Sequence, residues 1–180
     1  MRRFAMFALV AGVLAAPAAA LAVTDAPGDG TLVVENGAAP RGVAVVTLTI
    51  SGTAIGHVST GSPDQVDKVV IYDPNNTNNI GASGMNGALL SRTSNATAQR
   101  TTLVGNDFRF RAAGGIYKVW IYGTGVNLFA VGNGKVTLQG SPDSTGSSDG
   151  KYSLDGGDWH SLPAAPSDLL QFGSPSGSNG

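Results

Sequence analysis

Short runs of alternating apolar and polar residues, separated by glycine, constrain the fold of this chain more than any other feature. Between positions 116 and 122, apolar residues alternate with Lys118, Trp120 and Tyr122, which is the two-residue period of a strand buried on one face. A 3.6-residue period is not found over any segment of useful length. The 26 glycines, and the aspartates that supply all acidic residues except Glu35, favour strands and turns. We therefore predict an all-β fold.

The expected strands are separated by glycine-containing turns and by a turn-rich loop over 74–87. They cover residues 31–35, 42–51, 53–59, 66–73, 88–92, 99–104, 107–112, 116–122, 126–131, 135–139, 151–154 and 158–162, with a short closing piece at 169–172. The pair 151–154 and 158–162 is expected to form a hairpin.

An internal doubling appears when the chain is shifted by 71 residues. The register holds without a gap from position 31 to position 61 and keeps apolar residues on apolar residues. Its matches include Thr31-Leu32-Val33 with Thr102-Leu103-Val104, Ile50 with Ile121, and Gly52-Thr53 with Gly123-Thr124. We interpret the doubling as two related β-units packed face to face, which predicts a sandwich or flattened barrel. It also turns Lys118, Trp120 and Tyr122 toward solvent.

The first 22 residues have the pattern of a secretory signal peptide. A pair of arginines precedes an apolar run of 13 residues, and Ala20-Leu21-Ala22 fits the small-x-small cleavage pattern. The mature chain would begin at Val23, with one domain over 23–173 and a disordered tail over 174–180. We expect a secreted or cell-surface protein without a membrane span after cleavage, because a span needs about 20 apolar residues.

Charge and cysteine content limit the partners and cofactors that can be expected. Loss of the two signal-peptide arginines leaves 9 basic against 12 acidic residues. Nucleic acid and anionic membranes call for a clustered basic surface, so we expect neither as a partner. The chain has no cysteine, which excludes disulfides and thiolate zinc sites.

Two Gly-x-Gly segments organise the C-terminal half. Gly123-Thr124-Gly125 precedes the apolar strand 126–131, and Gly132-Asn133-Gly134 precedes Val136-Thr137-Leu138. In this order of strands and turns the chain resembles an uncharacterised family of small secreted bacterial β proteins. The resemblance implies a β fold, and no activity is assigned to that family.

The sequence contains no catalytic signature. Gly123-Thr124-Gly125 lacks the third glycine of a dinucleotide-binding loop, because position 128 is a leucine, and Gly134-Lys135 lacks the remainder of a P-loop. Neither His57 nor His160 lies near a Gly-x-Ser-x-Gly nucleophile motif. These glycines are better explained as hairpin turns. Aspartates that pair only in space leave a secreted hydrolase as an alternative.

A second alternative is a structural module stabilised by calcium. Asp143, Asp149, Asp155 and Asp158 are close in sequence within loops, and Ca²⁺ takes oxygen ligands from flexible loops. Their spacing matches no known calcium loop, and aspartates in turns commonly accept hydrogen bonds from their own backbone.

Aromatic residues provide the preferred functional hypothesis. Lys118, Trp120 and Tyr122 share the outward face of one strand, and Trp159 with His160 could extend it into an aromatic ridge. Such surfaces suit sugar rings or the side chains of a partner protein, although ordinary packing against a loop or hairpin would also explain them. We predict an exported, non-enzymatic domain that binds a glycan or an envelope protein.

Overall fold

The computed structural model describes residues 28–60, 67–84, 89–141 and 150–174, and these residues form strands and loops without a helix. The strands are β1 (Gly30–Gly37), β2 (Ala44–Ser59), β3 (Asp67–Asp73), β4 (Ile80–Gly84), β5 (Leu89–Ser94), β6 (Gln99–Gly105), β7 (Asp107–Tyr122), β8 (Val126–Leu138), β9 (Lys151–Leu154), β10 (His160–Ser161) and β11 (Leu170–Phe172). The predicted all-β fold is confirmed. The predicted signal peptide over 1–22 lies outside the described residues, as does the predicted tail except for position 174.

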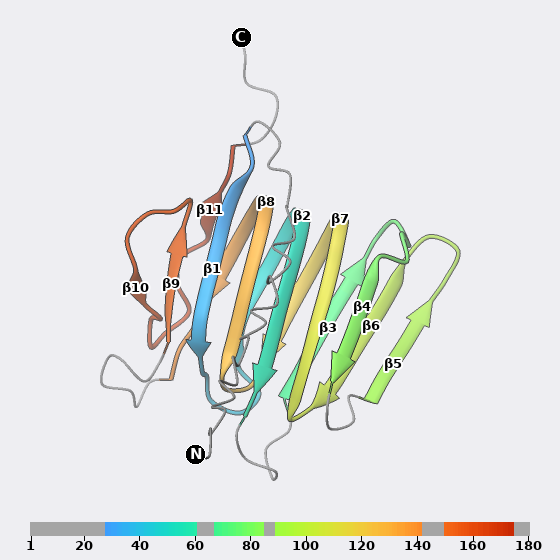
Figure 1. Cartoon of the computed structure of the whole chain (residues 1–180), viewed down its shortest axis with the longest axis horizontal. Coiled ribbons are helices and arrows are strands. Elements are labelled where there is room, and N and C mark those ends of the chain that lie inside the picture. Colours follow the sequence, from blue (N-terminus) through green and yellow to red (C-terminus); the bar gives the residue numbers. More distant parts are fainter. Residues whose placement is uncertain (1–27, 61–66, 85–88, 142–149, 175–180) are drawn as a thin grey trace, which may run out of the picture.

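All the strands belong to one antiparallel sheet, which is not closed into a barrel (Figure 1). Its order is β10-β9-β1-β8-β2-β7-β3-β6-β5, with β11 paired to β8 and β4 paired to β7. The predicted hairpin near the C-terminus is present, because β9 and β10 are paired. The long strands β2, β7 and β8 are central, and both β7 and β8 change partners midway. β8 pairs first with β1 and then with β11, while β7 pairs first with β4 and then with β3.

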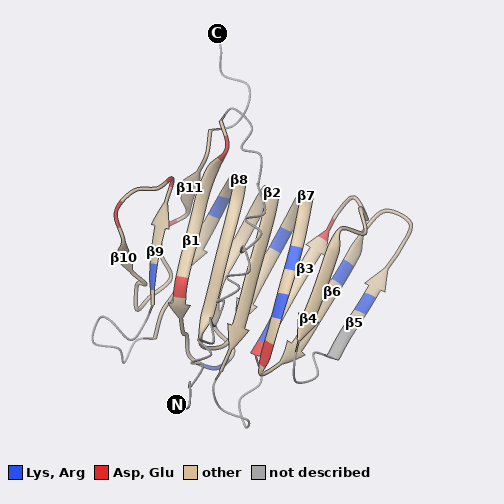
Figure 2. Ribbon diagram, viewed as in Figure 1, with Lys and Arg blue, Asp and Glu red and all other residues tan. Residues whose placement is uncertain are grey.

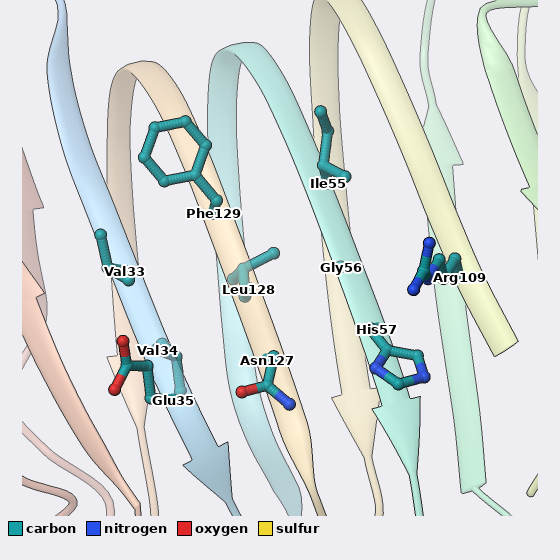
Figure 3. A pocket seen from close by; sticks show the side chains of 10 residues that line it. All are labelled: Val33, Val34, Glu35, Ile55, Gly56, His57, Arg109, Asn127, Leu128 and Phe129. Carbon is teal, nitrogen blue, oxygen red and sulfur yellow. The ribbon is translucent and has the colours of Figure 1, made fainter. Parts of the chain in front are cut away.

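A line of glycines crosses the sheet where these partners change. Gly132 is paired with Gly30 on one side and with Gly52 on the other, and Gly52 is also paired with Gly115. Gly52 and Gly132 have φ angles of 151° and 138°, which side-chain-bearing residues rarely adopt. A Cβ on Gly132 would lie 2.2 Å from the Ser51 carbonyl oxygen. The strands can therefore arch over at this line, which Figure 3 shows for β2, β7 and β8.

The core lies on the inner side of the arched sheet. In β7, Tyr117, Val119 and Ile121 are fully buried, and Leu48 and Ile50 of β2 join the same apolar cluster. Burying each large apolar side chain contributes roughly 1.5–3 kcal/mol. In β2 the buried positions keep the same two-residue phase through the glycine line. In β7 they change from even to odd numbers between Ala112 and Tyr117, where the pairing with β2 is irregular. In both halves the side chains between the buried positions point outward.

The structure does not confirm two related β-units. In the 71-residue register, Gly52 matches Gly123, yet Gly52 lies inside β2 and Gly123 lies between β7 and β8. The turn at 123–125 is not a hairpin, because the strands that it joins, β7 and β8, lie on either side of β2 and are not paired with each other. The predicted turn at 132–134 is instead part of β8. Glycine suits a bend within a strand as well as a turn between strands, and the pattern alone does not distinguish the two.

Candidate functional site

The second half of β7 presents its side chains as predicted. Lys118 is exposed, and Trp120 and Tyr122 are half-buried, whereas the residues between them are buried in the core. This part of β7 lies between β2 and β3. Their outward side chains therefore determine what surrounds the three predicted binding residues.

The surface around these residues is called the cationic face below. It comprises the outward side chains of β3, β6, residues 116–122 of β7, residues 44–51 of β2 and residues 133–138 of β8. Directly paired residues on neighbouring strands point to the same side of a sheet, so the pairing defines rows across this face. The row through Lys118 contains, in order, Arg100, Tyr72, Lys118, Thr49 and Lys135. The row through Trp120 contains Thr102, Val70, Trp120, Thr47 and Thr137.

Four basic side chains on this face are exposed: Lys68, Arg100, Lys118 and Lys135. The Lys68 ammonium lies 4.3 Å from the centroid of the Tyr122 ring, which is a cation–π contact. Among these cations, the sequence pattern indicated only Lys118. Alternation could place the others on the polar side of their own strands. It could not show that β6, β3, β7, β2 and β8 are consecutive in the sheet, because a local pattern does not determine which strands pair.

The acidic residues of β3 point to the opposite side. Asp67 and Asp73 are both fully buried. The Asp73 carboxylate accepts hydrogen bonds from the backbone N–H of Asn75 at 2.9 Å and of Thr77 at 2.7 Å, and from the Thr77 hydroxyl at 2.8 Å. These bonds replace the hydrogen bonds to water that burial removes from the Asp73 side chain. Inward placement keeps both carboxylates off the cationic face.

Asp67 is compensated less completely. Its Oδ1 accepts the backbone N–H of Thr124 at 3.2 Å, while its Oδ2 has no hydrogen-bond partner among the described residues. Burial raises the pKa of the Asp67 carboxyl to about 6, against the lowering effect of the Thr124 N–H. The carboxyl packs where a side chain of Gly123 would otherwise be.

The other two predicted ridge residues lie elsewhere. Trp159 is 46% exposed, and the Lys151 ammonium lies 4.3 Å from its ring. Lys151 is on β9 and forms a 3.0 Å ion pair with Glu35 of β1. His160 packs instead against Tyr152, with ring centroids 5.5 Å apart. Strands β1, β8 and β2 separate β9 from β7, so the five residues do not form one continuous ridge.

A second outward surface is called the mixed face below. It comprises the outward side chains of β1, β9, residues 126–131 of β8, residues 53–59 of β2 and residues 107–112 of β7. A shallow depression of about 450 Å³ crosses it. Figure 3 shows Val33, Ile55 and Phe129 around the depression. The polar side chains of Glu35, Asn127 and His57 lie toward one end, and Arg109 lies at its side.

His57, which has no nucleophile motif near it in the sequence, contacts a carboxylate on the mixed face. Its Nε2 lies 2.7 Å from Oδ1 of Asp107, and the two side chains are 36% and 39% exposed. A histidine held by a carboxylate can act as a base. No interaction of this histidine with a serine or threonine hydroxyl was found among the described residues, so the geometry provides a surface pair and not a catalytic triad.

The predicted calcium ligands are only partly within the described residues. Asp143 and Asp149 lie outside them, and Asp158 is exposed. The Asp155 carboxylate accepts the backbone N–H of Thr31 at 2.9 Å and of Gly173 at 3.2 Å, so it connects β1 to the end of β11. Across the described part of the chain, no group of three or more His, Cys, Asp or Glu side chains is placed to hold a metal ion.

One depression brings two carboxylates together, which bears on the hydrolase alternative. Asp29 and Asp155 both line a hollow of about 400 Å³. Asp29 Oδ1 accepts a hydrogen bond from the Asn133 amide at 3.2 Å, and Asp155 holds the backbone as described above. Both carboxylates therefore contribute to joining chain segments.

Comparison with known proteins gives no match to a family model, to a curated protein or to a solved structure. The resemblance to secreted β proteins therefore stays a prediction. Within the described residues, no helix has the length and apolar character needed to cross a membrane.

Proposed function

We propose that this chain is an exported glycan-binding domain and that the cationic face is its binding surface. The observation that carries this proposal is the outward position of Trp120 and Tyr122 on an open sheet face, beside the threonines at positions 47, 102 and 137. Sugars present apolar C–H surfaces and many hydroxyls. Half-exposed aromatic rings next to hydroxyl side chains offer partners for both.

The pattern of carboxylates favours binding over hydrolysis. Glycosidases use two carboxyl groups that flank the scissile bond. The described strands that form the cationic face carry two carboxyl groups, those of Asp67 and Asp73. Both point inward and are fully buried. A sugar on this face would meet cations, hydroxyls and aromatic rings. The signal-peptide pattern supports an extracytoplasmic location, where surface glycans are found.

Replacement of Trp120 tests the proposal. The full chain is titrated against a panel of soluble polysaccharides, and Trp120→Ala is compared with Trp159→Ala, which removes the same ring from outside the cationic face. Loss of a stacked ring costs up to about 1.5 kcal/mol, so we expect roughly tenfold weaker binding for Trp120→Ala and unchanged binding for Trp159→Ala. No binding by the unmodified chain, or equal effects of the two substitutions, would contradict the proposal.

A further inference from the structure

The cationic face is positively charged although the chain as a whole is not. Its four cations, Lys68, Arg100, Lys118 and Lys135, are exposed. The described strands that form it contain no outward acidic residue, because both carboxylates of β3 are buried. Of the two ion pairs among the described residues, neither involves these four cations. The net charge of the sequence therefore conceals a local surface that complements an anion.

Three of the cations are evenly spaced in one row. Arg100, Lys118 and Lys135 occupy β6, β7 and β8, and consecutive members are separated by one intervening strand. Neighbouring strands are about 4.8 Å apart, so the backbone positions of consecutive cations are about 10 Å apart. Tyr72 and Thr49 occupy the positions between them. The row is crosswise to the strands and would contact an extended ligand at regular intervals.

Trp120 lies beside this row. It is two residues from Lys118 along β7, which places it about 7 Å away along the strand. A polymer that follows the row could therefore stack a sugar ring on Trp120 or Tyr72 while its charged groups contact the cations. Tyr122 is less suited to stacking, because the Lys68 ammonium already lies over its ring.

We infer that the ligand of this face is a linear acidic polysaccharide with a carboxylate or sulfate on about every second sugar. This inference rests on the proposed function and specifies its substrate class. Widely spaced charges match cations about 10 Å apart. Nucleic acid carries its charges more densely, with one phosphate per 3.4 Å of each strand in a duplex. Binding of single strands relies on successive aromatic platforms, and here one of the three rings is covered.

The experiment uses hyaluronan oligosaccharides, which carry one uronate in every disaccharide, together with their carboxyl-reduced neutral form and oligo-dT. Affinities for the full chain are measured by calorimetry at two salt concentrations. The double variant Lys118→Gln/Lys135→Gln is compared with Arg109→Gln/Arg111→Gln, which removes the same charge from the exposed part of β7 on the mixed face. Melting temperatures establish that both variants are folded.

We expect hyaluronan to bind at least tenfold more tightly than its neutral form and to weaken with added salt. The Lys118→Gln/Lys135→Gln variant should lose at least tenfold in affinity, and the mixed-face control should retain it. If the neutral form binds as tightly as hyaluronan, and both double variants bind as tightly as the unmodified chain, this inference is overturned and the proposed function is left intact. Absence of binding to either form would overturn this inference, and absence of binding to the whole polysaccharide panel would overturn the proposed function as well. Tighter binding of oligo-dT, or equal losses in the two double variants, would overturn the polysaccharide assignment.

Discussion

The two outward surfaces of this protein are built from the same three long strands, yet they treat charge differently. On the mixed face, His57 lies 2.7 Å from Asp107 and Lys151 lies 3.0 Å from Glu35. Figure 2 shows acidic and basic positions together on β1, β9 and β7. The cationic face has basic side chains and aromatic rings, and its acids are turned inward. The mixed face also has exposed cations, Arg109 and Arg111, but outward acids lie among them. The cationic face has no outward acid on its described strands, so it has more to gain from an external anion.

The division between the faces depends on the glycine line, and disrupting it should have the largest effect. We expect Gly132→Ala to destabilise the fold by at least 3 kcal/mol, because its φ of 138° is unfavourable for alanine and the new Cβ would meet the Ser51 carbonyl oxygen. Chemical denaturation measures the change. Gly81→Ala in β4 is the matched control, since a Cβ there meets no atom within 4 Å. Equal stability of the two variants would show that the arch does not require glycine.

The inward position of Asp67 keeps its carboxyl off the cationic face but lowers the stability of the fold near neutral pH. Its folded-state pKa of about 6 exceeds the ordinary value of 3.8, so the folded state holds this proton more tightly than the unfolded state. The stabilisation that this tighter proton binding gives the fold is fully present below pH 3.8 and is lost as the pH rises through 6. The difference corresponds to at most about 3 kcal/mol at pH 7.

The substitution Asp67→Asn should remove this dependence. We expect the variant to gain about 1–3 kcal/mol over the unmodified chain between pH 4 and pH 7, as measured by urea denaturation at each pH. Comparison of the two proteins at each pH cancels contributions from the other groups. A stability difference that stays constant over this range would refute the account of Asp67.

The contact between His57 and Asp107 on the mixed face should matter least. Because His57 and Asp107 are each more than a third exposed, we expect Asp107→Asn to change stability by less than about 1 kcal/mol. Hyaluronan affinity should also be unchanged. Denaturation and calorimetry on the same sample test both statements. A loss of affinity would mean that the two faces are not independent.

Local pattern was sufficient to predict part of this structure. Alternation correctly placed Lys118, Trp120 and Tyr122 outward, because the two-residue period of a strand is a local property. It could not group Lys118 with Arg100 and Lys135, which depends on which strands pair across the sheet. It also joined Trp159 and His160 to the wrong surface for the same reason. The glycines at 52 and 132 were interpreted as turns, since a bend and a turn require the same residue.

The direct test of the central claim is to map where an acidic polysaccharide binds. Backbone amide chemical shifts of the full chain are recorded by NMR during titration with hyaluronan oligosaccharides. The account predicts that shifts concentrate on β3, β6 and the parts of β2, β7 and β8 on the cationic face, with few changes on β1, β4 and β9. Shifts concentrated around His57 and Phe129 on the mixed face would contradict it.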